Sequence, residues 1–290
     1  MIRKSLYCLL FAVLTLFACS HQNEQGIVNM RDLSAYAVSD TTAIRHGRLL
    51  RAAHLADVTD GDLQQLAALP LTKVIDFRLE PEKQGRVDRL PEGAEYIALP
   101  IDASGNATAQ ATDSKQPSRK KFDIRKIIVM VAFNEQAQQV AKTMYHTLFF
   151  SPDCQAQYAQ FFREVLATDS GALLFHCSQG KDRTGVAAAL LLAALGADRE
   201  TIVADFDATN AVYAADVRKY SRRVRLFGGG DEELAVVKAF IGVNTDSFVQ
   251  ELDRIDSQYG SLGNYLKGPI GLTDEDMNTL RNRYITSLNK

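Results

Sequence analysis

The 290-residue sequence predicts one α/β domain with a central, mostly parallel sheet flanked by helices and a helical C-terminal third. Two observations predict this class. Residues 172–176, Ala-Leu-Leu-Phe-His, form an apolar run typical of a parallel strand that is buried on both faces. After a turn that contains glycine, residues 185–195 form an Ala- and Leu-rich helical pattern without a charged side chain. A helix that is apolar all round belongs in the middle of a domain.

In the N-terminal half, local patterns predict one helix and two strands. Thr59 is placed to cap a helix whose leucines recur at helical spacing until Pro70 ends it. Residues 73–77 and 96–99 are short segments rich in β-branched and aromatic side chains, and both predict strands. With the strand at 172–176 they supply three neighbours for a parallel sheet.

The middle of the chain changes character twice. Residues 103–121 are small and polar and are expected to form a loop, and residues 122–150 return to an apolar-rich pattern that predicts a helical insertion. Pro152 suits the first position of the next helix, with Ser151 as its cap. Further helices are expected at residues 200–217 and in the segments that follow Asp231 and Thr245.

The N-terminus has the pattern of an export signal. Arg3 and Lys4 precede an apolar run at residues 6–18, which is shorter than the ~20 residues of a membrane-spanning helix. The run ends in Leu-Phe-Ala-Cys, which resembles a lipoprotein cleavage site that leaves Cys19 as a lipidated N-terminus. An ordinary secretory signal cut near the same point is the alternative. The expected location is therefore the cell envelope, with a lipid anchor on the periplasmic face or the surface.

These patterns predict a lipoprotein signal at residues 1–18, a tether at 19–28 and a catalytic domain at 29–290. The 33 basic and 35 acidic residues give a net charge of −2, so the chain has no basic excess for coating nucleic acid. Membrane contact is expected only through the N-terminal anchor.

Cysteine and histidine usage excludes two other classes of protein. Of four cysteines, Cys8 leaves with the signal and Cys19 takes the lipid, so only Cys154 and Cys177 remain in the domain, too few for a disulfide scaffold. The five histidines show no metal-ligand spacing. We expect no metal and no cofactor. Cys154 is expected in the core, with an oxidative disulfide to Cys177 as the alternative.

The segment His-Cys-Ser-Gln-Gly-Lys-Asp-Arg-Thr-Gly at residues 176–185 carries the chemistry. A buried strand ends at Cys177, the chain turns around Gly180, and the apolar helix begins near Thr184. Amide groups of such a turn and the helix N-terminus form a nest for an anion, and Arg183 can bind two phosphoryl oxygens. The same positive groups lower the pKa of a thiol, which makes it a nucleophile. The alternative is an inert buried cysteine beside a charged surface cluster.

This segment resembles the signature loop of the protein tyrosine phosphatase superfamily, and its full form is similar to the atypical bacterial branch of PtpB-like tyrosine and lipid phosphatases. The resemblance implies a tyrosine-phosphatase-like fold. It departs from the family at Ser34-Ala35 and Ala52-Ala53, and residues 103–150 match nothing in it. Weaker matches lie at residues 29–33, 47–51, 54–55, 75–78, Glu80, Glu82, 259–261 and 265–266.

The resemblance, together with the chemistry of the loop, implies a role for each loop residue. Cys177 is the nucleophile that forms a phosphocysteine, and Arg183 stabilises the transition state. Thr184 donates to the departing thiolate or only caps the helix, and His176 orients the loop. Phosphate binding is assigned to Ser178, Gln179, Gly180 and Lys181.

The general acid has three candidates. Asp182 ranks first because similar loops in myotubularin-type phosphatases carry an acid there, and Asp102 and Asp76 are the alternatives. Lys181 is expected as a second cation at the pocket mouth, which favours phosphoinositides beside phosphotyrosine. A solvated lysine is the alternative for Lys181.

We therefore expect a Cys-dependent phosphomonoesterase that acts on a phosphorylated protein or phospholipid. Two alternatives stay open. One is a phosphate-binding pseudophosphatase, and the other is rhodanese-like sulfur or arsenate chemistry on the same loop.

Overall fold

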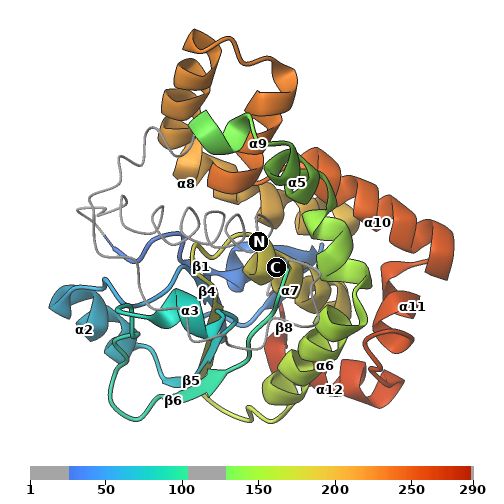
Figure 1. Cartoon of the computed structure of the whole chain (residues 1–290). Coiled ribbons are helices and arrows are strands. Elements are labelled where there is room, and N and C mark those ends of the chain that lie inside the picture. The colour runs from blue at the N-terminus through green and yellow to red at the C-terminus, as the bar shows by residue number, and fades with distance from the viewer. Residues whose placement is uncertain (1–25, 104–128, 289–290) are drawn as a thin grey trace.

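The structure, a computed structural model, describes residues 26–103 and 129–288 (Figure 1). The predicted signal, Cys19, most of the tether and nearly all of the loop expected at 103–121 lie outside these residues. A five-stranded sheet has the order β1-β4-β7-β5-β6, in which only β1 is antiparallel to its neighbour. Its strands are β1 (Arg31–Asp32), β4 (Leu49–Ala52), β7 (Ala172–His176), β5 (Leu71–Asp76) and β6 (Glu95–Ala98). The predicted mostly parallel sheet is confirmed.

The three predicted strands correspond to β5, β6 and β7; β7 has the predicted bounds, and the ends of β5 and β6 are shifted by one or two residues. Strands β1 and β4 were not predicted, because they are too short to show periodicity. A second, antiparallel sheet was not predicted either; it consists of β2 (Ala37–Ser39), β3 (Thr42–Ile44) and β8 (Ile285–Ser287). This small sheet joins the two ends of the domain, because β3 pairs with β8.

Helices cover the sheet, and the C-terminal third is mostly helical, as predicted. The central helix begins earlier than expected, at Asp182, and the helix expected at 200–217 continues to Leu226. Thr59 caps its helix with a reciprocal bond to Asp62. Besides a 3₁₀ turn at Leu33–Ala35, the helices are α2 (Asp60–Ala68), α3 (Glu80–Lys83), α5 (Glu135–Phe150), α6 (Pro152–Leu166), α7 (Asp182–Leu195), α8 (Arg199–Leu226), α9 (Asp231–Ile241), α10 (Thr245–Tyr259), α11 (Leu262–Lys267) and α12 (Asp274–Tyr284).

Two segments differ from the expected boundaries. The predicted insertion at 122–150 breaks near Asn134, whose side chain caps α5. At the N-terminus, the carbonyl of Val28 accepts a hydrogen bond from the amide of Ala53 at 2.9 Å, so the packed part of the chain begins before Asn29. Among the described residues, no helix combines the length and the apolar character needed to span a bilayer.

Strand β7 lies in the middle of the sheet and divides the core in two. Leu173 and Phe175 pack on the side of α6 and α7, whereas Ala172 and Leu174 pack with Leu66 of α2 on the other side. Because side chains alternate along a strand, His176 at its end belongs to the α2 side and Cys177 to the α7 side. Cys177 indeed lies in the larger core cluster. The side chains of His176 and Cys177, at the C-terminal end of β7, therefore lie on opposite sides of the sheet.

Helix α7 follows the loop that begins at Cys177, and it packs closely against α8. At Gly185 a Cβ atom would lie 2.8 Å from the ring of Phe206 on α8. That ring is itself fixed by stacking on Phe248, with a centroid distance of 3.8 Å. A glycine at the first turn of α7 therefore brings α8 against the base of the catalytic helix.

Candidate active site

The loop between β7 and α7, residues Cys177–Lys181, makes one tight turn at Gly180. Gly180 has a φ of +63°, in the left-handed region that glycine adopts without strain. A Cβ atom there would also lie 2.3 Å from the carbonyl oxygen of Ala52 on β4. Both the backbone conformation and the contact with β4 therefore require glycine at this position.

Three successive carbonyl groups of this loop accept hydrogen bonds from the rest of the domain. The amide of His54 reaches the Ser178 carbonyl at 3.5 Å. Asn29 Nδ2 and Tyr213 Oη donate to the Gln179 carbonyl at 3.1 and 2.9 Å. Asn29 Nδ2 and Arg51 Nη2 donate to the Gly180 carbonyl at 2.9 and 2.8 Å. The donors come from the N-terminal segment, β4 and α8, so they hold the outer side of the loop.

This outer anchoring fixes the direction of the loop amides. In a planar trans peptide the carbonyl and the following N–H point in opposite directions. With the carbonyls of residues 178–180 held outward, the N–H groups of Gln179, Gly180 and Lys181 face the inner side of the turn. Within the described residues, none of the amides of residues 178–183 donates to a protein oxygen. Together they form a nest suited to an oxyanion at the N-terminus of α7.

Arg183 is held beside this nest by Glu82 of α3. Its Nη1 and Nη2 atoms lie 2.7 Å from the two carboxylate oxygens of Glu82, and Nη1 also donates to the Phe77 carbonyl at 3.0 Å. Glu82 in turn accepts hydrogen bonds from the Ser178 hydroxyl and the Leu79 amide. Burial alone would raise the pKa of Glu82, but Arg183 and these donors lower it overall. The bidentate pair fixes the plane of the guanidinium.

Cys177 lies buried at the floor of the nest, in a site that favours the thiolate. Burial acts to raise the pKa of the thiol, but the Arg183 guanidinium and the side chain and amide of Thr184 outweigh it and lower the pKa. The Thr184 side chain is fully buried, and its hydroxyl has no hydrogen-bond partner among the described residues. A thiolate beside a guanidinium and free amides can attack a bound phosphoryl group.

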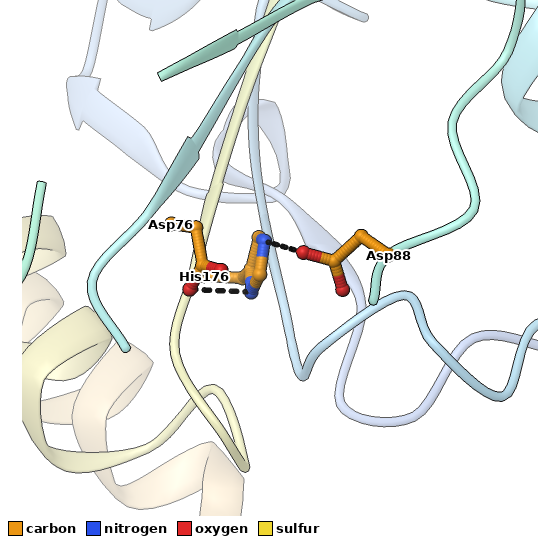
Figure 2. A group of neighbouring side chains, drawn as sticks. All are labelled: Asp76, Asp88 and His176. Atoms are coloured by element: carbon orange, nitrogen blue, oxygen red, sulfur yellow. Dashed lines mark ion pairs between the residues drawn. The ribbon is translucent and has the colours of Figure 1, made fainter. Parts of the chain in front are cut away.

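His176 lies on the opposite side of the sheet, in a buried cluster of four charged groups with Arg78, Asp76 and Asp88. Figure 2 shows the imidazole between the two carboxylates, with Nδ1 3.7 Å from Asp76 and Nε2 3.2 Å from Asp88. Burial acts to lower the pKa of His176, but Asp76 and Asp88 raise it overall. The Nδ1 atom also lies 3.2 Å from the Cys177 carbonyl. Through this contact, His176 holds the backbone of Cys177 from the side of the sheet opposite the thiol.

The same cluster brings together three groups that could ligate a metal, Asp76, Asp88 and His176. The guanidinium of Arg78 takes the place of a cation between the carboxylates, because it lies 2.8 Å from Asp76 and 2.6 Å from Asp88. A charged His176 supplies the second positive charge. Two cations facing two carboxylates already balance the cluster, so the arrangement is that of a buried ion-pair network.

The three candidate acids lie in different places. Asp182 begins α7 and is buried, with its carboxylate 2.8 Å from the Tyr145 hydroxyl and 3.1 Å from Lys181 Nζ. Asp102 is half-buried and directly follows Ile101, whose carbonyl lies 3.5 Å from Arg183 Nη1. Asp76 belongs to the cluster on the far side of the sheet. Burial acts to raise its pKa, but His176 and Arg78 lower it well below the usual range, so it is ionised at neutral pH.

Lys181 is buried rather than solvated. Its ammonium donates to the carbonyls of Ala239 and Gly242 at 2.7 Å each, and it lies 3.1 Å from Asp182. These contacts tie the catalytic loop to the C-terminal end of α9. The phosphate-binding role expected for Lys181 stays a prediction.

Gln179 and Cys154 complete the set of predicted site residues. Gln179 is buried and its side-chain oxygen has no hydrogen-bond partner in the described part of the chain. Both domain cysteines are free thiols. Cys154 donates to the Asp102 carbonyl at 3.4 Å, and burial raises the pKa of its thiol to about 11.

The sequence analysis did not assign roles to several residues that shape the site. Asn29 carries a φ of +54°, and its side-chain oxygen accepts from Arg31. Arg31 and Arg51 both pair with the buried Asp205 of α8. Asn29 and Arg31 lie in the weak family match at residues 29–33, and Arg51 lies in the one at 47–51, so the sequence did carry a signal for these residues. The contribution of α8 is not visible, because a lone aspartate in a helix has many explanations.

Comparison with known proteins agrees with this geometry. Residues 23–286 match the tyrosine phosphatase family. The chain is 30% identical over 277 residues to the triple specificity protein phosphatase PtpB of Mycobacterium tuberculosis, covering 88% of this chain and 96% of that protein. It is also 30% identical over 246 residues to a tyrosine-protein phosphatase of Nostoc commune, covering 83% of this chain and 76% of that one.

The Glu82–Arg183 pair gives a first prediction. Glu82→Gln removes the charge that holds the guanidinium plane, and we expect kcat/KM for p-nitrophenyl phosphate to fall by roughly ten- to hundredfold. Glu80→Gln is the matched control, because Glu80 is exposed and contacts only Lys83 among the residues described. Equal kcat/KM values for Glu82→Gln and the wild type would show that Glu82 does not position Arg183.

The pKa of His176 gives a second prediction. A raised folded-state pKa stabilises the fold below the unfolded pKa of about 6.5, and that stabilisation is lost as the pH rises through the folded value. In urea unfolding between about pH 6 and 9, the wild type should lose stability with rising pH more steeply than His176→Asn. Parallel curves for the wild type and His176→Asn would contradict a charged His176.

Proposed function

The chain belongs to the tyrosine phosphatase family, and from that premise we propose that it hydrolyses phosphate monoesters through a covalent phosphocysteine at Cys177. The single observation that carries the proposal is the arrangement of one buried sulfur, one guanidinium and a row of inward-facing amides at the start of α7. This arrangement provides a nucleophile and a binding site for the oxyanion in the same turn. The pseudophosphatase and the rhodanese-like alternatives are not favoured.

The first half of the reaction forms the phosphocysteine. The Cys177 thiolate attacks phosphorus in line with the leaving oxygen, the S–P bond forms and the P–O bond breaks. Arg183 and the amides of the loop stabilise the charge that develops on the three equatorial oxygens. Because Glu82 already holds the guanidinium in one plane, Arg183 needs little rearrangement to bind them.

The second half returns the free enzyme. Water attacks phosphorus, the S–P bond breaks and phosphate leaves. Thr184 is buried next to the sulfur, and its hydroxyl stabilises the departing thiolate by donating to it. The same lowered thiol pKa that makes Cys177 a nucleophile also makes it a good leaving group.

Asp182 is our choice for the acid that protonates the leaving oxygen. It begins the helix that also carries Arg183, and the Tyr145 hydroxyl orients its carboxylate at 2.8 Å. Asp102 is the alternative, because it lies one residue from a carbonyl that contacts Arg183. Asp76 suits the role poorly, since it is ionised and lies behind the strand.

For substrates we propose phosphotyrosine first and phosphoinositides second. The relative from M. tuberculosis carries triple specificity in its name, which supports a broad substrate range for proteins of this kind. Lys181 was expected to recognise a second phosphate, but its ammonium already has three partners in the protein. A preference for phosphoinositides would therefore have to come from other residues.

We also propose export and lipid anchoring through Cys19. The support is the sequence at the N-terminus, where Arg3 and Lys4 precede the apolar run and the cleavage pattern. These residues lie outside the described part of the structure. Labelling by a radioactive fatty acid in a bacterial host, lost in Cys19→Ala, tests the anchor.

Hydrolysis of p-nitrophenyl phosphate in the presence of EDTA tests the reaction itself. We expect turnover that vanadate inhibits and that Cys177→Ser abolishes, because the hydroxyl is a far weaker nucleophile at neutral pH. Cys154→Ser should retain activity, since that thiol has a high pKa and no role in the reaction. Wild-type rates in Cys177→Ser would exclude the proposed mechanism.

Leaving-group dependence identifies the acid. Asp182→Asn should slow hydrolysis of phenyl phosphate by ~10²-fold or more and that of p-nitrophenyl phosphate much less, because a good leaving group needs no proton. Asp102→Asn is the matched variant. If Asp102→Asn shows this difference and Asp182→Asn does not, the acid is Asp102.

A further inference from the structure

The turn that joins α8 to α9 exposes two large apolar side chains. Leu226 is 78% exposed and Phe227 is 70% exposed. The turn itself is ordered by hydrogen bonds, because the amides of Phe227 and Gly229 donate to carbonyls of Arg223 and Val224. In Figure 1 this turn lies at the top of the molecule, at the end of the hairpin that points away from the sheet. We call residues 218–230 the hairpin tip.

The exposed face of α8 beside these side chains is basic. Arg218, Arg222 and Arg225 recur at helical spacing and are exposed, and Lys219 lies next to them. Within the described residues no carboxylate pairs with any of the three arginines, whereas Lys219 lies 3.8 Å from Asp216. The opposite face of the helix is apolar and packs on α9.

Besides Asp216, the acidic residues nearest in sequence to these arginines are three at the start of α9. Glu232 lies 3.4 Å from Lys142 of α5, and Glu233 accepts a hydrogen bond from the Gly230 amide at 2.8 Å. Asp231 is exposed. In the described part of the chain none of these three carboxylates is paired with an arginine of α8, so the exposed face of α8 keeps its positive charge.

We propose that the hairpin tip docks on a bilayer that contains anionic phospholipids. The arginines would contact lipid phosphates, and Leu226 and Phe227 would enter the boundary between headgroups and acyl chains. A basic face alone fits any polyanion, and an apolar pair alone fits many surfaces. Basic residues next to exposed apolar side chains are the combination that an anionic interface attracts. This contact is separate from the membrane contact expected at Cys19.

The base of the same hairpin contacts the catalytic loop. Tyr213 of α8 donates to the Gln179 carbonyl, and Lys181 donates to carbonyls at the end of α9. Leu226 lies thirteen positions after Tyr213 along α8, which is about 20 Å of helix. Docking by the tip would therefore hold the catalytic loop at about that distance from the lipid surface.

A local fluorophore tests the contact. The sequence has no tryptophan, so Phe227→Trp in the full chain provides a single reporter at the tip. We expect a blue shift of its emission, and quenching by brominated acyl chains, with vesicles of phosphatidylcholine and phosphatidylglycerol. Phosphatidylcholine vesicles alone should have little effect. The reporter responds to the tip even if the N-terminal segment also binds the vesicles.

Charge variants complete the test. In the Phe227→Trp background, the pair Arg222→Gln and Arg225→Gln should weaken vesicle binding by about thirtyfold, since each basic residue near an anionic surface contributes about a factor of five. Arg45→Gln, at an exposed arginine elsewhere, should change nothing, and Val87→Trp should show no shift with vesicles. Unchanged p-nitrophenyl phosphate hydrolysis would show that the variants fold.

Three results would overturn the proposal. The first is the absence of a shift with phosphatidylglycerol vesicles. The second is equal binding by the arginine variants and their parent. The third is a shift with heparin or nucleic acid in solution but none with vesicles, which would identify a soluble polyanion as the partner.

Discussion

The active site depends on the outward anchoring of three carbonyl groups in one short loop. A peptide unit is rigid, so holding its carbonyl on one side commits its N–H to the other. The His54 amide and the side chains of Asn29, Arg51 and Tyr213 hold the outer side, and the amides on the inner side have no protein partner among the described residues. The anion site is thus prepared before a substrate arrives, at the expense of amides that could otherwise have been paired within the protein.

The sheet then separates two kinds of electrostatics. On the α7 side, Cys177 and Arg183 face a nest of amides, and the pKa of the thiol is lowered. On the α2 side, His176 and Arg78 neutralise Asp76 and Asp88 in a closed ion-pair network. The two environments belong to consecutive residues, because the side chains of His176 and Cys177 lie on opposite sides of the sheet. If Asp76 or Asp88 faced the thiol, a negative charge would oppose formation of the thiolate.

Much of this could be predicted from the sequence, and the limits have physical causes. The parallel strands and the central helix are long or apolar enough to give a clear pattern. The loop motif itself contains the nucleophile, Cys177, and the phosphate-binding arginine, Arg183. The supporting residues are different. Glu82 lies 101 positions before Arg183, and Asn29 lies 150 positions before Gln179, so only the folded chain brings them together. Likewise, nothing in the sequence distinguishes a lysine that is solvated from one like Lys181, whose partners are backbone carbonyls.

The Asn29 contacts have a consequence for how the enzyme becomes competent. Asn29 lies 150 positions before Gln179. Bringing two such distant residues together costs conformational entropy, so the contacts between them form slowly in folding. The signature loop cannot acquire its shape from its own residues, because the donors to its carbonyl groups lie elsewhere: at Asn29 before β1, at the end of β4, and on α8. Catalytic competence is therefore a property of the assembled domain, and a fragment that carries only β7, the loop and α7 would keep the nucleophile while losing the cradle around it.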